Sequence, residues 1–283
     1  MPINPDAVGA TGDLLRFSWS SKDALLYAIS VGGGTPDLAF STENTIGIPQ
    51  QVLPTFAVVA GTDSGGFETS AMSRIGTFDM AMGFHGSEEV ELHRPIPVAG
   101  EAECQDRVAA IYDKGKAAVV VLESEARLLD GEPLWTLRAT TFLRGEGGWG
   151  GDRGPSGARN TPPDRVPDHE ATLPTSVDQA LLYRLNGDRN PLHSDPSFSA
   201  RAGFETPILH GLCTYGFTGR ALLRAYCDND PARLRLMDGR FSSTVLPGDV
   251  LTVRSWLLDE GVAVFTTAVG DRTVLDQGLV RFE

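Results

Sequence analysis

Cysteines, basic clusters and long apolar runs are all scarce in this sequence, and each scarcity excludes a class of protein. The 283 residues include three cysteines, at positions 104, 213 and 227, whose spacing fits neither a zinc site nor a disulfide framework. No Lys/Arg run occurs and the net charge is −13, so we expect no nucleic-acid partner. No apolar run approaches the roughly 20 residues of a membrane-spanning helix, so we expect no membrane partner.

The same scarcities bear on location. Three unpaired cysteines favour a reducing, intracellular compartment. Residues 1–6 lack the basic start and the apolar run of a signal peptide, and residues 281–283 are not a peroxisomal address. The sequence therefore predicts a cytoplasmic protein.

What is present indicates a globular chain with a sizeable core. Apolar residues make up 41% of the sequence and charged residues 22%, which is typical of folded proteins. The length favours about two domains. Residues 145–170 are crowded with Gly, Pro, Arg and Asp, and are therefore the best linker candidate.

One pattern occurs on both sides of that linker. Residues 20–23 and 176–179 have capping-box spacing, and the letters Ala-Leu-Leu-Tyr follow each, at 24–27 and 180–183. In each half a β-rich meander comes later, with matching turns at 113–115 and 259–261. The chain is therefore predicted to be an internal duplication.

A helix with one wide apolar face is the strongest signal of the second half. Apolar residues recur at steps of four and three from Ile208 to Tyr226, and Pro207 suits a first helical turn. The first half offers a short helix ending at the glycines 32–34 and an apolar segment at 53–60 that could be a buried helix. Residues 61–82 show no clear period.

These patterns predict an α+β fold. Helices followed by runs of strands favour an antiparallel sheet packed on helices, and two such units should pack as a pseudo-dimer. The arrangement is a double hot dog, in which each repeat wraps an antiparallel sheet around a central helix. The expected divisions are an N-terminal repeat at 1–144, a linker at 145–172 and a C-terminal repeat at 173–283.

One stretch carries an acid, an amide and an imidazole together. Gly187 and the pair Asn190-Pro191 are strong turn signals, so Asp188, Asn190 and His193 should lie on a short, stiff loop after a helix. A carboxylate and an imidazole five residues apart can face one space, as acid–base chemistry requires. This loop is the candidate active site.

The duplicated copy lacks this chemistry. Aligning the two Leu-Leu-Tyr matches places Gly32 opposite Asp188 and Asp37 opposite His193. The first repeat is therefore expected to shape a pocket.

Residues 187–193 resemble the signature of the MaoC-like, or type 2, enoyl-CoA hydratases. Residues 206–211 are similar to the start of that family's central helix, and residues 85–89 and 92–97 resemble its double-hot-dog members. The resemblance implies reversible hydration of trans-2-enoyl-CoA to (3R)-3-hydroxyacyl-CoA, without a metal or other cofactor.

The resemblance also assigns roles. Asp188 and His193 become the catalytic pair, with the formal base left open, and Asn190 orients the water and the loop. The backbone N–H of Gly211 becomes the donor to the thioester oxygen, where enolate charge develops; a helix N-terminus suits that charge. His210 either lines the site or holds the loop by a hydrogen bond.

Contacts to CoA are expected from two further pairs. His85-Gly86 is implied by the resemblance. Arg240 could meet a CoA phosphate and Phe241 could stack on adenine, although a solvated strand-start Arg is the equal alternative. Edge-to-edge pairing of sheets within the family implies a homodimer. A hot-dog acyl-CoA thioesterase and a non-catalytic acyl-CoA-binding module remain open as other functions.

Overall fold

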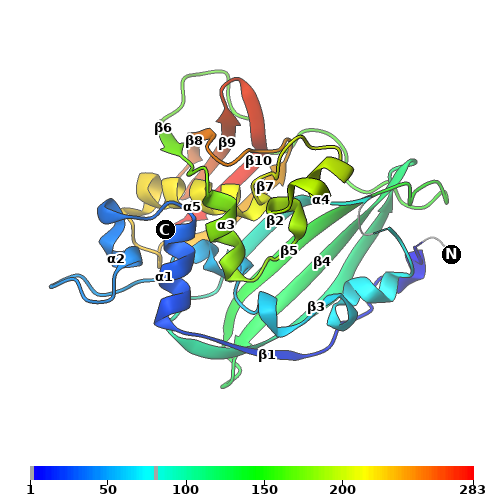
Figure 1. The fold of residues 1–283 in the computed structure, drawn as a ribbon, viewed down its shortest axis with the longest axis horizontal. Helices are drawn as coiled ribbons and strands as arrows, with labels where there is room; N and C mark the ends of the chain where they lie inside the picture. The colour runs from blue at the N-terminus through cyan, green and yellow to red at the C-terminus, as the bar shows by residue number, and fades with distance from the viewer. Residues whose placement is uncertain (1–2, 80–81) are drawn as a thin grey trace.

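One ten-stranded antiparallel sheet forms the back of the molecule. The computed structural model describes residues 3–79 and 82–283, and Figure 1 shows the strands behind a layer of short helices. The strands are β1 (Leu15–Trp19), β2 (Gly83–Leu92), β3 (Gly100–Asp113), β4 (Ala117–Leu128), β5 (Pro133–Arg144), β6 (His169–Pro174), β7 (Leu234–Phe241), β8 (Val250–Asp259), β9 (Val262–Val269) and β10 (Arg272–Phe282).

The strand order carries the internal duplication. It runs β1-β3-β4-β5-β2-β7-β10-β9-β8-β6, so each half contributes five neighbouring strands in matching order from its own edge. The halves join where β2 pairs with β7, with Glu88 opposite Gly239 and Val90 opposite Met237. Edge-to-edge pairing of two hot-dog sheets thus occurs inside one chain, and the free edges are the short strands β1 and β6.

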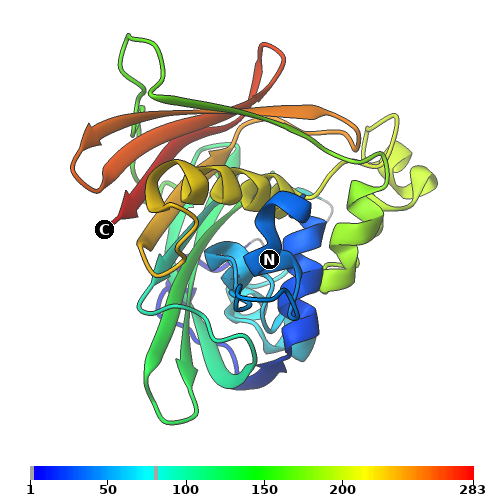
Figure 2. The same ribbon diagram turned by 90° about the vertical axis from the view of Figure 1, so that its left-hand side faces the viewer.

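The helices lie on the concave side of this sheet. They are α1 (Ser21–Ser30), α2 (Leu38–Ser41), α3 (Gln179–Tyr183), α4 (Pro196–Arg201) and α5 (Gly211–Cys227). Figure 2 shows α5 running along the sheet, with α1 beside it. The repeated tyrosines Tyr27 and Tyr183 are buried, with ring centroids 6.4 Å apart. The two predicted Leu-Leu-Tyr helices therefore meet at the centre of the molecule.

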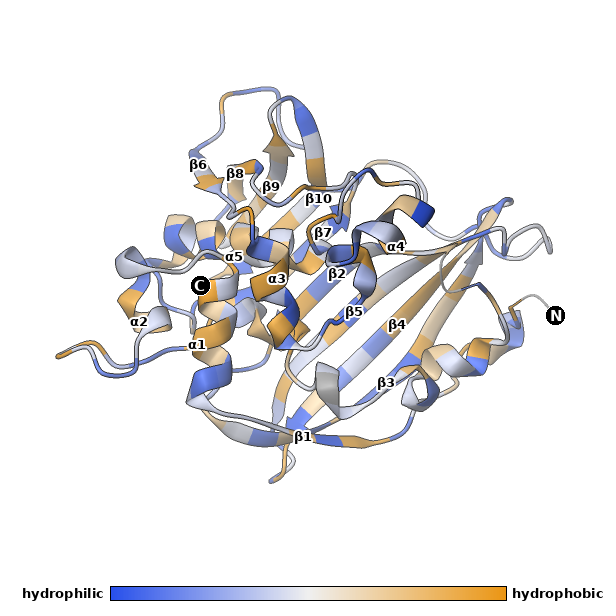
Figure 3. Cartoon of the chain, in the orientation of Figure 1, coloured by the Kyte–Doolittle hydropathy of each residue, from blue (hydrophilic) through white to orange (hydrophobic). Residues whose placement is uncertain are grey.

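Alternating side chains give the sheet its two faces, since successive residues of a strand point to opposite sides. Orange and blue alternate along β3 and β4 in Figure 3. In β4, Val120 is buried within the inner core, whereas Glu123, three residues further on, joins Arg107 and Arg138 on the other face. This alternation leaves the inner face of the first repeat free to enclose a cavity.

The long helix begins later than its sequence pattern predicts. Residues 206–210 are not helical, and α5 starts at Gly211 with His210 as N-cap in an extended conformation. The backbone N–H of Leu209 bonds to Val245 O at 2.8 Å, so this segment runs along a neighbouring strand connection instead of entering the helix. The prediction that Pro207 occupies the first helical turn is wrong.

The first repeat has no α-helix as long as α5 among its described residues. The apolar segment at 53–60 forms only the 3-10 turn η3 (Pro54–Val58), and η4 (Thr62–Ser64), η5 (Phe67–Thr69) and η6 (Ala71–Ile75) follow it. Gly61, at φ +83°, adopts a conformation that disfavours other residues. Frequent glycine and short 3-10 turns explain why residues 61–79 have no hydrophobic periodicity in the sequence. Residues 80 and 81 of the same unperiodic stretch, 61–82, lie outside the described residues.

The predicted linker is irregular from residue 145 to 168, and β6 begins within its range at His169. That strand pairs with β8 along its whole length, because an edge of the second half-sheet is open to it. His169 therefore belongs to the second half-sheet. The exact division of the chain into units stays a prediction.

Candidate active site

The candidate loop forms because each of its turns has a local cause. Helix α3 continues into the 3-10 turn η8 (Arg184–Asn186), and Gly187 ends it at φ 122°, a conformation that favours glycine. The Asp188 carboxylate then accepts a hydrogen bond from Asn190 N at 3.1 Å. Asn190 Oδ1 in turn accepts from Leu192 N at 3.0 Å and caps the turn η9 (Pro191–His193).

His193 is buried at the end of this loop and has a defined tautomer. Its Nδ1 lies 2.8 Å from Ile208 O. A carbonyl oxygen can only accept, so Nδ1 carries the proton and, in the neutral ring, Nε2 keeps a free lone pair. Burial lowers the pKa of His193, although the bond to Ile208 and the charge of Asp188 oppose that shift. The ring is therefore held neutral and able to accept a proton.

His210 lies directly against His193. The two rings stack with centroids 3.7 Å apart and an angle of 26° between their planes. His210 Nε2 donates to the backbone carbonyl of Asp188 at 3.3 Å. Burial, and then the neighbouring His193, lower the pKa of His210 to about 4. His210 thus supports the loop by a hydrogen bond, and the stacking of the two imidazoles is a feature that the sequence pattern did not predict.

Asp188, His193 and His210 form one cluster. One carboxylate oxygen and one nitrogen from each imidazole lie within 4.8 Å of one another. Asp188 is the most open member, with 40% of its side chain exposed, whereas both histidines are buried. Two imidazoles and a carboxylate are also a donor set that binds transition metals, so this cluster is the place where the described residues could hold a metal ion.

The start of α5 completes the site. Gly211 is the first residue of the helix and follows His210 directly. The first N–H groups of a helix have no partner within it and carry its positive dipole end. The ring of Phe241 lies over Gly211, since a Cβ added there would sit 3.2 Å from it. The structure thus brings Gly211 next to the loop that carries Asp188 and His193.

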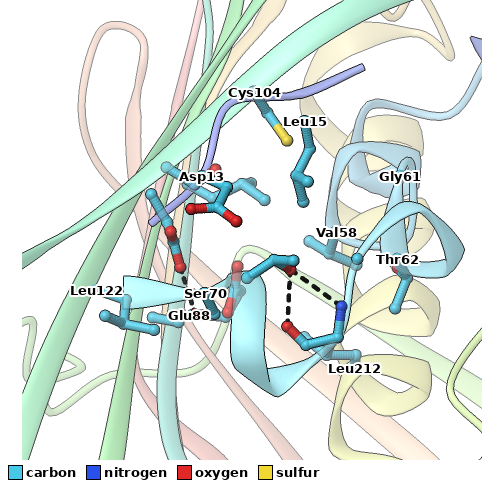
Figure 4. A pocket seen from close by; sticks show the side chains of 17 residues that line it. Asp13, Leu15, Val58, Gly61, Thr62, Ser70, Glu88, Cys104, Leu122 and Leu212 are labelled. Atoms are coloured by element: carbon cyan, nitrogen blue, oxygen red, sulfur yellow. Dashed lines mark hydrogen bonds between the residues drawn. The ribbon is translucent and has the colours of Figure 1, made fainter. Parts of the chain in front are cut away.

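A cavity of about 320 Å³ opens beside this helix start. It lies between the inner face of the first half-sheet and the turns that follow η3, and Figure 4 shows Val58 and Thr62 on one side with Leu122 and Glu88 on the other. Leu212, the residue after Gly211, lines it. The three residues of the cluster do not line the cavity; Leu212 connects the two places.

The residues predicted to contact CoA lie at the junction of the two half-sheets. His85 sits on β2, where its ring is 4.9 Å from that of Phe241 at the end of β7. Gly86 lies at a bulge of β2, where a Cβ would come within 2.7 Å of Thr140 Oγ1. Arg240 is half-exposed at the end of β7, not its start, and both its Nε and Nη2 bond to Asp276 at 2.7 Å.

The corresponding loop of the first repeat has a different use. Asp37, which aligns with His193, is buried and pairs with Arg220 at 2.9 Å and Arg224 at 2.5 Å. Arg220 also donates to Gly32 O. Both arginines belong to α5. The central helix of the second repeat therefore holds the loop of the first repeat that contains Gly32 and Asp37 and lacks the acid–imidazole pair.

Each half of the chain matches a known family of protein domains. Residues 159–277 match the family described as MaoC like domain, and residues 17–145 match the MFE-2 hydratase 2 N-terminal domain. The chain is 47% identical to the 3-hydroxyacyl-thioester dehydratase Y of Mycobacterium tuberculosis, over 100% of this chain and 99% of that protein. It is 44% identical to the enoyl-CoA hydratase ChsH3 of the same organism, over 90% of each.

Solved structures give the same result. A MaoC-like dehydratase from Phytophthora capsici superposes with a TM-score of 0.90 at 30% identity, covering 99% of this chain and 98% of that one. The predicted α+β double-hot-dog fold is confirmed. Among the described residues, no helix is long and apolar enough to cross a membrane.

Proposed function

The chain belongs to the MaoC-like hydratase and dehydratase family, and from this premise we propose that it interconverts trans-2-enoyl-CoA and (3R)-3-hydroxyacyl-CoA. Asp188 and His193 are the proposed catalytic pair. The observation that carries this proposal is their spacing. A water that bonds to both groups at about 2.7–3.2 Å spans acceptor atoms about 4–5 Å apart, which matches a cluster whose ligating atoms lie within 4.8 Å.

The proposed reaction uses that single water. Its oxygen bonds to C3 while one of its protons passes to the catalytic pair, and the pair returns a proton to C2. The neutral His193, with its Nε2 lone pair free, suits the first transfer. Asp188 is more exposed and lies where it can hold the same water.

Negative charge forms on the thioester oxygen as C3 is attacked. We propose that the N–H of Gly211 receives it, because the N-terminus of the 17-residue helix α5 presents an N–H and a positive dipole end there. Glycine lets the carbonyl come close, and the contact with Phe241 leaves little room for a side chain.

His210 and Asn190 support this pair in the proposal. His210 is only 1% exposed, and its bond to the carbonyl of Asp188 holds the loop against the start of α5. Asn190 shapes the turn through its cap on η9, and its part in orienting the water stays a proposal.

The CoA moiety is proposed to lie near His85, Gly86, Arg240 and Phe241. The rings of His85 and Phe241 already pack together beside Gly211. Arg240 would meet a phosphate while also bonded to Asp276, so its contribution should be smaller than that of a free guanidinium.

The acyl group is proposed to occupy the cavity next to Leu212, within the degenerate first repeat. Its volume of about 320 Å³ lies at the lower end of small-molecule pockets, about 300–1,000 Å³. It equals about ten water volumes of roughly 30 Å³, and a methylene group is of similar size. Complete filling of the cavity therefore sets an upper limit of about ten carbons beyond C3.

The proposed chemistry requires no metal ion and no redox cofactor, because water activation and charge stabilisation are both supplied by protein groups. The cluster could nevertheless hold a metal ion. Full activity after treatment with a chelator supports the proposal, and activity that disappears and returns with one divalent metal opposes it.

We also propose a cytoplasmic homodimer. The three cysteines are free, which fits a reducing compartment. The free edges β1 and β6 leave strands to which another copy could bind. Light scattering on the purified chain distinguishes a monomer from a dimer.

The decisive experiment follows the conjugated absorbance of trans-2-enoyl-CoA. A hydratase removes it without releasing thiol. Release of free CoA, seen with a thiol reagent, would indicate the thioesterase alternative, and saturable binding without turnover would indicate a binding module.

A further inference from the structure

Glu88 is a buried carboxyl group that the proposed reaction does not use. It lies on β2 with 3% of its surface exposed, yet it lines the cavity beside Leu212. Figure 4 shows it facing the same space as Val58 and Leu122. Burial raises its pKa, against the effect of its bond to His85. A buried carboxyl normally needs partners for both oxygens, since an unpaired polar group in an apolar place is costly.

Only one of the two oxygens has such a partner in the described residues. Glu88 Oε2 bonds to His85 Nε2 at 2.9 Å. Oε1 has no such bond, and it does not belong to the fully buried unpaired atoms of the described residues, so it is open to the cavity. The bond to His85 also fixes the direction of the carboxyl group, because His85 packs on Phe241 and Phe241 packs on Gly211. The free oxygen is therefore held in place on the wall of the cavity.

Asp13, Asp106 and Ser124 also line the cavity, but Glu88 is the one buried carboxyl group of its wall among the described residues. Leu122, Leu137 and Leu212 supply apolar surface near it. The hydroxyl of Thr62 is already bonded to Val59 O at 2.6 Å. The carboxylate of Asp106, which also lines the cavity, already accepts hydrogen bonds from the Ser70 hydroxyl and the N–H of Ala71.

We propose that Glu88 is a specificity-determining residue, and that the preferred substrates are acyl thioesters whose chain carries a hydrogen-bond donor, such as a hydroxyl group, beyond C3. This inference rests on the proposed function, because it assigns the cavity to the acyl chain. A hydroxyl gives Oε1 the partner that it lacks. A plain hydrocarbon chain displaces water from Oε1 without offering a hydrogen-bond donor in its place. Sites built to bond a hydroxyl group discriminate strongly against substrates that lack one.

The test compares trans-2-enoyl-CoA esters of one chain length, either plain or with a single hydroxyl at successive carbons beyond C3. The intact protein should hydrate at least one hydroxylated ester with a kcat/KM about ten- to a hundredfold above that of the plain ester, which is the value of one hydrogen bond to a carboxylate. Glu88→Leu should abolish this preference and favour the plain ester. Glu88→Gln should retain part of it, because the amide oxygen still accepts a hydrogen bond.

Glu89→Leu is the matched control. Glu89 is the next residue of β2 and points to the outer face, where it lies 3.6 Å from Arg138. The substitution removes the same charge and adds the same side chain, and it should leave the preference unchanged.

The inference is overturned if the intact protein prefers no hydroxylated ester at any position, or if the preference survives in Glu88→Leu. The first result needs no variant, so a misfolded variant cannot hide it. Hydration of plain and hydroxylated esters at equal rates would reject the role of Glu88 alone. Failure to hydrate any ester would reject the proposed function.

Discussion

Replacing His193 with asparagine separates its chemical role from its structural one. In the intact protein Nδ1–H donates to Ile208 O, and the opposite nitrogen is free to take a proton from water. The amide nitrogen of asparagine is bonded to Cγ, as Nδ1 is, so it can replace the donor, but it cannot act as a base. We therefore expect His193→Asn to fold and to lose most of its activity.

The size of the loss follows from the geometry. General acid–base catalysis contributes about 10²–10⁴-fold, which is about 3–5.5 kcal/mol of transition-state stabilisation at about 1.4 kcal/mol per factor of ten. The free energy of unfolding should change little, because Ile208 O keeps a donor. Leaving that carbonyl unpaired would instead cost about 1–3 kcal/mol, which we expect in His193→Ala.

The assay is the loss of conjugated absorbance of trans-2-enoyl-CoA, with thermal unfolding measured on the same samples. Turnover of His193→Asn within about tenfold of the intact protein would refute the role of His193 as a catalytic group. An equal loss of stability in the Asn and Ala variants would refute the structural part of the reasoning.

Three other expectations follow from the same contacts. Gly211→Pro removes the proposed oxyanion donor while proline is tolerated at the first position of a helix. Its Cβ meets Phe241, as the Cβ of Gly211→Ala does, so kcat should be about 10²–10³-fold lower in the Pro variant than in the Ala variant, with α5 intact by circular dichroism; equal kcat in the two variants rules out this donor. Because the pKa of His193 is lowered and that of His210 lies at about 4, kcat/KM should stay level as the pH falls through 6.5 and decline only below it, and a decline centred at or above 6.5 contradicts this. Asp37→Asn leaves the buried guanidinium of Arg220 without its partner and should cost about 3–5 kcal/mol of stability, measured by denaturant unfolding, with kcat of the folded fraction unchanged; a stability loss below about 1 kcal/mol would show that the pair is not needed.

The candidate loop could be predicted from the sequence because its structure is locally determined. Gly187 requires a positive φ, Asn190 caps the turn that follows it, and Pro191 fixes the start of η9. Such turn chemistry is encoded within a few residues. The duplication was equally visible, since the capping patterns and the meander turns recur at matching places.

Features that depend on distant parts of the chain could not be predicted. The sequence pattern predicts that the long helix starts near Pro207, but α5 starts at Gly211. The difference arises because the N–H of Leu209 bonds to Val245 O, which lies far along the sequence. The stacking of His193 on His210 depends on the same displacement. Alternation along β2 puts Glu88 on the same face as Val90 and Leu92, but the local pattern does not show that a cavity lies against that face, because its opposite wall comes from residues 58–70.

The partners of the predicted CoA contacts show the same limit. The sequence predicts Phe241 only as a residue that could stack on adenine, yet its ring lies over Gly211 and against His85. Asp37 looked like a missing catalytic residue, and the structure gives it two arginines from α5. In both cases the role comes from a residue of the other repeat, which a single-sequence pattern does not reveal.

The most direct test of the central claim is the configuration and yield of the product formed by the intact protein and by Asp188→Asn. Asparagine keeps the size of the side chain, and the loop bond from Asn190 can still reach its oxygen. The account predicts that the intact protein converts trans-2-enoyl-CoA to the (3R)-3-hydroxyacyl product and that Asp188→Asn, folded and still binding substrate, forms at least about a hundredfold less. Equal yields from the two proteins, or a (3S) product, would contradict it.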